Sequence, residues 1–445
     1  MSEVPAGAGA AETRLSNRRV LAIALPILLS NVTVPLLGAV DTAVIGQLGR
    51  AAPIAAVGLG ATATHFVYWM FGFLRMGTSG LVAQASGAGD AAETGALLTR
   101  ALIVALGAGL VFVLLQVPIV AGAMALSPAD AEVEAMAAAY LSIRLWGAPF
   151  AISVYALTGW LIAMENTRGV LWTQVGMNAL NAGLSALFVL GFGWGVEGVA
   201  AATVIAEAFG AAVGLRLCRS AFAGDQWRDL KRVFDPARVR RMAEVNGDIM
   251  LRSALLEIGF AFFIFQSPQF GTAVLAANHV LFRFFEITAY ALDGFAFAAE
   301  SLVGRAFGAR RPAALRRAAR LASLWGLVAT GLLSAAFLLF GEAIVALMTT
   351  AEDVRAAAGE FLPWIALAPV LGLPAFMLDG IFIGATRTRD MRNGMLISVV
   401  IYLAAWAALT PVFGAHGLWA ALLVFFGARG VTLGLRYPAL ERAAG

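Results

Sequence analysis

Apolar stretches of twenty or more residues recur along the whole of this 445-residue chain. Only 13% of the residues are charged and 60% are hydrophobic, whereas a soluble domain carries roughly 25% charge. A helix needs about 20 consecutive apolar residues to cross a bilayer. The sequence therefore predicts an all-α membrane protein that crosses a lipid bilayer many times.

Charge clusters and Gly/Pro turns divide the apolar sequence into twelve predicted transmembrane helices. The predicted ranges are 20–46, 53–82, 96–122, 136–163, 170–192, 195–218, 242–266, 273–303, 318–348, 356–385, 393–413 and 416–436. No HExxH motif, Walker A loop or nucleophile elbow is present, and the three histidines are scattered. The sequence therefore argues against an enzyme.

Arginines crowd the N-terminal segment and every second predicted loop, including 219–241, whereas the alternate loops are acidic, as in "SPADAEVEA" at 127–135. The positive-inside rule then places both termini in the cytoplasm. We expect a multi-pass protein of a bacterial inner membrane. The net charge of +4 reflects this topology, so no nucleic-acid partner is expected.

The two halves of the sequence resemble each other at one constant spacing. "GFLRMGTSGLVAQASGAG" (72–89) matches "GFAFAAESLVGRAFGAR" (294–310), and "GWLIAMENTR" (159–168) matches "GIFIGATRTR" (380–389). This repeat predicts two six-helix lobes with a binding site between or within them. The predicted parts are an N-terminal tail (1–18), an N-lobe (19–218), a linker (219–241), a C-lobe (242–436) and a C-terminal tail (437–445).

Several motifs closely resemble the DinF branch of the MATE multidrug and toxin extrusion transporters. They include "PLLGAVDTAVIGQLG" (35–49), "YALDGFAFAAESLVGRAFGAR" (290–310) and "LDGIFIGATRTRDMRNGM" (378–395). The resemblance implies a central cavity and export of lipophilic, often cationic small molecules against an inward flow of protons or sodium. No cofactor other than the coupling ion is expected, and we expect a monomer.

One carboxylate, Asp41, interrupts the first apolar helix. A charged Asp at the centre of a membrane helix costs about 2.5–3.5 kcal/mol on insertion scales, and burial favours its protonated form. Such a group exchanges a proton with either side, and it holds a cation only when ionised. The resemblance assigns this coupling role to Asp41; the alternative is a structural Asp bonded to neighbouring hydroxyl groups.

The fifth predicted helix carries Asn178, Asn181 and Ser185 on one face, at spacings of three and four residues. Some MATE branches have an "NxxxD" motif here, in which Asn181 matches the Asn and Ser185 replaces the Asp. This difference argues against a scheme with two carboxylates at this position. The amides otherwise form interhelical hydrogen bonds.

The sixth predicted helix places Thr203 and Glu207 on one face. Thr203 matches a polar position of the family's N-lobe network. An unpaired Glu207 near the middle of the bilayer would be expensive. Glu207 is therefore either a second protonatable group or the partner of an arginine.

Other residues are expected at the same cavity. Pro26 and Pro35 each remove a backbone hydrogen bond from helix 1 and favour a kink, which would let the helix bend as Asp41 changes charge. The remaining expected cavity residues are Asn31, Thr33 and Tyr155.

The C-lobe contains Glu257 and Asp379, which are candidates for an ion site because sodium-coupled relatives use acids in helices 7 and 10. Glu257 falls close to the first of these positions and Asp379 is out of register with the second, so the sequence favours protons. A lipid-linked precursor flippase of the same superfamily is a further alternative. Flippases of that kind usually carry cavity arginines, and mid-helix arginines are few here.

Overall fold

The computed structural model describes residues 15–127 and 129–445; residues 1–14 of the predicted N-terminal tail lie outside this part. The first half of the described chain is helical and contains α1 (Asn17–Gly46), α2 (Ala51–Trp69), α3 (Gly72–Gly87), α4 (Ala91–Leu114), α5 (Gln116–Ala125), α6 (Ala131–Leu145), α7 (Ala148–Ala163), α8 (Thr167–Ala186), the π-helical turn η1 (Leu187–Gly191) and α9 (Gly195–Leu217).

A short connecting segment leads into the second half. The connection contains η2 (Arg219–Phe222), η3 (Gln226–Arg228) and α10 (Leu230–Val233). The second half contains α11 (Pro236–Gln266), η4 (Ser267–Phe270), α12 (Thr272–Gly308), α13 (Pro312–Met348), α14 (Glu352–Gly384), α15 (Thr388–Gly434) and α16 (Tyr437–Ala443).

These helices agree with the twelve predicted spans. Seven of the described helical segments are long and apolar enough by themselves to cross a bilayer, one of them being α2 and α3 together, and the pair α6–α7, bent by 52°, makes an eighth. The more polar helices α8, α11 and α12 add three. The last span comes from α15, which contains two helices joined at Gly414, where φ is 56°.

Large apolar side chains cover much of the outer surface. Leu339 is 75% exposed, Leu347 is 89% exposed and Phe265 is 80% exposed. Exposed apolar area of this extent is costly in water and favourable in hydrocarbon. The surface therefore matches the lipid environment that the composition predicts.

The turns at the arginine-rich end repeat between the two halves. Gly89 and Arg310, which correspond to each other in the sequence repeat, follow α3 and α12 with positive φ angles of 75° and 53°. Glu165 and Thr386, which also correspond in the repeat, follow α7 and α14 with φ angles of 60° and 49°. The internal repeat of the sequence is thus present in the backbone.

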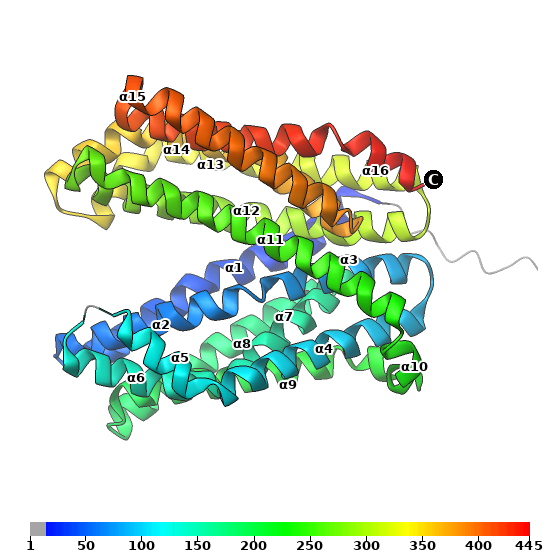
Figure 1. Ribbon diagram of the computed structural model, residues 1–445, viewed down its shortest axis with the longest axis horizontal. Helices are drawn as coiled ribbons and strands as arrows, with labels where there is room; N and C mark the ends of the chain where they lie inside the picture. The colour runs from blue at the N-terminus through cyan, green and yellow to red at the C-terminus, as the bar shows by residue number, and fades with distance from the viewer. Residues whose placement is uncertain (1–14, 128) are drawn as a thin grey trace, which may run out of the picture.

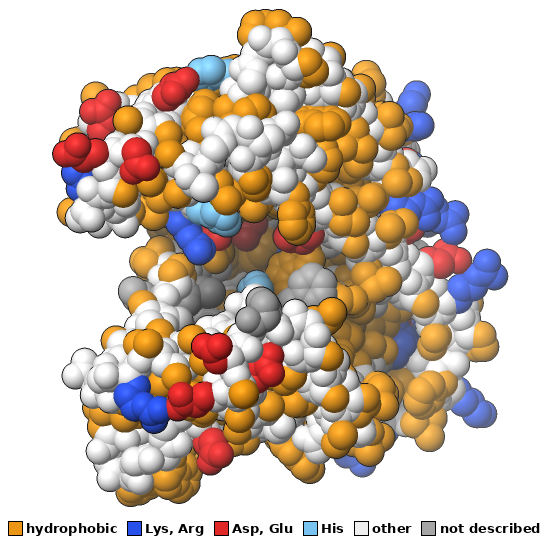
Figure 2. Space-filling view, turned by 60° about the vertical axis from the view of Figure 1, so that its left-hand side comes forward, with side chains coloured by type: hydrophobic (Ala, Val, Ile, Leu, Met, Phe, Trp, Pro, Cys, Tyr) orange, Lys and Arg blue, Asp and Glu red, His pale blue; other side chains and the backbone are white. Residues whose placement is uncertain are grey.

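The helices form two halves that meet at one end and diverge at the other (Figure 1). Helices α1–α9 lie in one half and α11–α15 in the other, and the halves meet where α3 and α12 end in the arginine-rich turns. Figure 2 shows a hollow between the halves at the opposite end, with a largely hydrophobic wall and some acidic side chains.

Polar contacts join the halves at the arginine-rich end. The side-chain amide of Gln84 donates to the Gly384 carbonyl oxygen (3.0 Å) and to Oγ1 of Thr386 (2.9 Å). Glu165 binds Arg19 of its own half (2.7 Å) and Arg305 of the other half (3.2 Å). The structure is therefore closed at this end and open at the other.

Candidate functional site

Asp41 lies on α1, about 8 Å from the end of the helix by the rise of 1.5 Å per residue. Its side chain is buried, with 8% exposed. The hydroxyl of Ser185 on α8 donates a hydrogen bond to Oδ1 of Asp41 over 3.0 Å. The bond places the two residues at the same depth, as the helical rise predicts.

Two further hydrogen bonds link α8 to its neighbours. The side-chain amide of Asn178 donates to the carbonyl oxygen (3.0 Å) and to Oγ1 (2.8 Å) of Thr33 on α1. The side-chain amide of Asn181 donates to Oγ1 of Thr203 on α9 (2.9 Å), and Thr203 donates in turn to the Val199 carbonyl. Oδ1 of Asn181 is buried and accepts no hydrogen bond from the described residues.

These contacts assemble a polar cluster in the first half, which we call the α1–α8–α9 cluster. It contains Thr33, Asp41, Asn178, Asn181, Ser185 and Thr203. Asn178 and Asn181 thus form interhelical hydrogen bonds. The cluster also leaves an acceptor atom, the buried Oδ1 of Asn181, free to bind a donor.

The remaining expected cavity residues lie outside this cluster. Helix α1 continues unbroken through Pro26 and Pro35. The side-chain amide of Asn31 donates to the Tyr290 carbonyl oxygen of the other half (3.1 Å). Tyr155 on α7 is half-buried and makes no side-chain hydrogen bond within the described part of the chain.

Glu207 on α9 forms a buried ion pair with Arg144 at the end of α6. Both carboxylate oxygens are bound, over 2.9 Å and 2.8 Å. Gly147, at the bend between α6 and α7, leaves room for this carboxylate, because a methyl group there would overlap Oε2 of Glu207. Of the two alternatives for Glu207, the structure contains the arginine pair.

The two C-lobe acids have different surroundings. Asp379 on α14 is buried, and its Oδ2 accepts hydrogen bonds from Arg252 on α11 and from Arg429 on α15 (2.7 Å for Arg429). Glu257 is exposed on α11. The described residues contain no group of three or more His, Cys, Asp or Glu side chains that could hold a metal ion.

Another buried acid, Glu300, joins the two halves. Arg75 on α3 lies 3.5 Å from Oε2 of Glu300 on α12 and stacks over the Phe297 ring, 3.9 Å from its centroid. Sequence reasoning did not assign these partners. A signal was available, because a lone arginine in an apolar span, such as Arg429 in "VFFGARGVT", needs a carboxylate or a ring nearby.

Two lobes around a hollow, with buried ionisable groups on the helices beside it, define a multi-spanning membrane transporter. The model of the MatE family matches residues 26–187 and 249–405, and the chain belongs to this family. It is 39% identical to the DNA damage-inducible protein F of Escherichia coli (strain K12), over 91% of each chain. It is 30% identical to a probable multidrug resistance protein NorM of Bradyrhizobium diazoefficiens, over 88% of this chain and 84% of that protein.

Solved structures have the same fold. A MATE crystal structure in the bent conformation superposes with a TM-score of 0.86, at 18% identity and 96% coverage of both chains. The Vibrio cholerae MATE transporter VcmN in its bent form gives a TM-score of 0.86 at 22% identity, with 96% of this chain and 97% of that chain covered. The chain therefore belongs to a family of membrane transporters and has the MATE fold, as its resemblance to the DinF branch predicts.

Proposed function

We propose that this transporter is a proton-coupled antiporter that exports lipophilic, often cationic small molecules. Asp41 is its coupling carboxylate. The observation that carries the proposal is the difference between Asp41 and three other buried acids. Glu207, Glu300 and Asp379 each bind an arginine, whereas the hydrogen-bond partner of Asp41 is the neutral hydroxyl of Ser185.

This difference matters because an arginine stays charged at every physiological pH. Each of these three carboxylates faces a guanidinium group, and removing the carboxylate charge would leave that buried guanidinium without its counter-charge. Within the described part of the chain, Asp41 has no arginine partner, so it accepts a proton without leaving another charge unpaired. Ionised Asp41 binds a cationic substrate, and protonated Asp41 releases that substrate. Proton binding and substrate binding are therefore mutually exclusive.

The α1 helix supplies the mechanical link. Pro35 lies six residues before Asp41 and has no N–H to donate within the helix. Asn31, which precedes Pro35 on α1, binds the Tyr290 carbonyl oxygen of the other half. A change of charge at Asp41 therefore acts on a helix that bends easily and touches both lobes.

Protons are favoured over sodium because of the C-lobe. Sodium prefers several oxygen ligands, and Asp379 is instead held by two guanidinium groups. The same pairing argues against a flippase, because Arg252 and Arg429 are engaged with a carboxylate and are not both available for a phosphate. In the membrane, the positive-inside rule places the arginine-rich end in the cytoplasm, so the hollow opens to the opposite side. We propose that the protein works as a monomer.

The test uses purified protein in proteoliposomes loaded with a lipophilic cationic dye. Dye movement is followed under a pH gradient without sodium, and under a sodium gradient at constant pH. The proposal expects transport in the first condition only, and its loss in Asp41→Asn. Transport driven by sodium alone, or transfer of a lipid-linked phosphate in place of the dye, would overturn it.

A further inference from the structure

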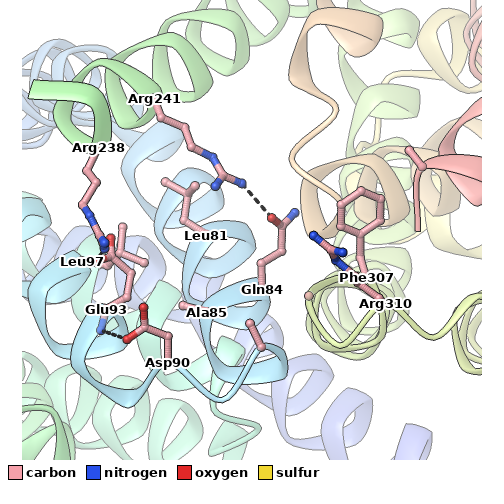
Figure 3. Close-up of a pocket in the computed structure, with 13 residues that line it drawn as sticks. Leu81, Gln84, Ala85, Asp90, Glu93, Leu97, Arg238, Arg241, Phe307 and Arg310 are labelled. Carbon is pink, nitrogen blue, oxygen red and sulfur yellow. Dashed lines mark hydrogen bonds and ion pairs between the residues drawn. The ribbon is translucent and has the colours of Figure 1, made fainter. Parts of the chain in front are cut away.

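A cavity separate from the hollow lies at the arginine-rich end, where the two halves meet (Figure 3). Its volume is about 580 Å³. We call it the seam cavity, because α3 and α4 of one half and α11 and α12 of the other half line it. Its polar lining residues are Gln84, Asp90, Glu93, Arg238, Arg241 and Arg310.

The carboxylates of this cavity are already neutralised. Asp90 binds Arg232 over 3.0 Å. Glu93 binds Arg238, and it also binds Arg100 over 2.9 Å. The negative charges on this wall are therefore matched by arginines that face them.

Two further arginines of the cavity, Arg241 and Arg310, have no carboxylate partner within the described part of the chain. Arg241 donates to the neutral amide oxygen of Gln84 over 2.9 Å and approaches Oγ1 of Thr386 at 3.5 Å. The side chain of Arg310 makes no hydrogen bond or ion pair within the described part of the chain, and it lines the cavity beside Phe307 (Figure 3). The cavity thus presents two guanidinium groups that no carboxylate of the described residues binds.

The backbone of Arg310 indicates that its side chain is retained at a cost. Its φ is 53°, in the left-handed region where glycine is favoured. Gly89, at the equivalent position of the first half, has this conformation and is a glycine. A non-glycine residue in this region is strained, and such residues concentrate at functional sites. The positive-inside rule explains an arginine in this loop, but not an arginine at this position of the turn.

We propose that the seam cavity binds a phosphate group, and that the ligand is the phosphodiester headgroup of an anionic lipid. A guanidinium fork matches the oxygens of a phosphate, and basic pockets between helices on the cytoplasmic side of a membrane bind anionic headgroups. Leu81, Leu97 and Phe307 add apolar lining, and the volume exceeds that of a lone phosphate ion.

Ligand binding here has a conformational consequence. The seam cavity exists only while α3 lies against α12, because both halves supply its walls. A ligand that binds one conformation shifts the population toward it. The bound headgroup therefore stabilises the form that is closed at the arginine-rich end.

The test measures thermal unfolding of the full-length protein in a neutral detergent during titration with three probes. The probes are phosphatidylglycerol, phosphatidylcholine and inorganic phosphate. The variant is Arg241→Gln/Arg310→Gln, and its matched control is Arg317→Gln, an exposed arginine of the same end that does not line the cavity. Each lost charged hydrogen bond should weaken binding roughly tenfold.

The proposal expects phosphatidylglycerol to raise the unfolding temperature of the wild type and of Arg317→Gln, and to do so far less in the double variant. Phosphatidylcholine should have no such effect. If inorganic phosphate alone gives the full shift, and the double variant abolishes it, the cavity binds phosphate from solution and the assignment to a lipid headgroup is wrong. Equal shifts in the double variant and the wild type would overturn the site.

Discussion

Gly87 and Gly308 occupy equivalent positions of the sequence repeat, one in each half, and each lies against the backbone of the other half. A methyl group on Gly87 would overlap the carbonyl oxygen of Arg305, and one on Gly308 would overlap the carbonyl oxygen of Gln84. Gln84 and Arg305 are themselves an equivalent pair of the repeat. The closed end is thus a pseudo-symmetric contact between α3 and α12, in which glycine lets the two backbones touch.

This contact predicts the effect of a single methyl group. Gly87→Ala or Gly308→Ala should separate the halves at the arginine-rich end, because the obstructing atom is backbone and cannot rotate away. We expect transport to fall several-fold, and overpacking of this kind costs about 1–3 kcal/mol. The measurement is the distance distribution between spin labels at positions 168 and 317, in a Cys218→Ser background.

The matched control is Gly331→Ala, because nothing lies within 4 Å of a methyl group at that helical position. It should leave both the distances and the transport rate unchanged. Closed-state distances in Gly87→Ala and Gly308→Ala that equal those of the wild type would show that the contact does not hold the end closed.

A second prediction concerns Asp41 and its hydroxyl partner. Asp41→Asn should abolish dye transport driven by a pH gradient without reducing thermal stability, because an amide still accepts from Ser185. Ser185→Ala should keep transport but change its dependence on pH, because it removes the bond to Oδ1 and leaves the carboxyl group in place. Transport assays across pH 6 to 8 test both variants.

The control for these variants is Asp353→Asn, an exposed acid at the start of α14. It should behave as the wild type does. Proton-driven transport that persists in Asp41→Asn would remove Asp41 from the coupling role.

A third prediction follows from the buried pair of Arg144 and Glu207. Glu207→Gln leaves a buried guanidinium without its counter-charge, and breaking a buried pair in this way costs about 3–5 kcal/mol. The variant should therefore unfold at a lower temperature. Arg144→Met/Glu207→Met, which removes both charges, should recover most of the loss.

Stability and transport together decide what Glu207 does. If the double variant is stable and still transports the dye, the pair is structural. If Glu207→Gln is as stable as the wild type and only its pH optimum moves, Glu207 exchanges protons despite its partner.

A fourth prediction separates the C-lobe acids from ion coupling. Glu257→Gln should transport as the wild type does, because the Glu257 side chain is exposed and its removal orphans no buried partner. Asp379→Asn should lower the unfolding temperature, because Arg252 and Arg429 lose their carboxylate. Neither variant should acquire or lose a response to sodium at constant pH. A sodium response in the wild type that disappears in either variant would contradict this.

Much of the architecture follows from the sequence alone. The spacing of apolar runs predicts the spans, because the thickness of the bilayer fixes the length of each helix. The repeat between 72–89 and 294–310 predicts two similar halves, and the left-handed turns at Gly89 and Arg310 confirm this repeat. The sequence also singles out Asp41, because an ionisable residue in an apolar membrane helix is energetically costly.

The partners of the buried charges could not be read in this way. Glu207 is 63 residues from Arg144, and Asp379 is 127 residues from Arg252 and 50 from Arg429. Sequence patterns report which face a residue occupies on its own helix, but not which helix packs against that face. Without the partner, an acid that exchanges protons and an acid in an ion pair look alike.

The helices, their repeat and the positions of the ionisable groups follow from the amino-acid sequence, because they depend on local composition and on the bilayer. The packing of the helices places Asp41 against a hydroxyl group, and Glu207 and Asp379 against arginines. The same packing forms the seam cavity between α3 and α12. The physical reason is that the charge state of a buried group depends on the few atoms around it, and packing brings those atoms from distant parts of the chain.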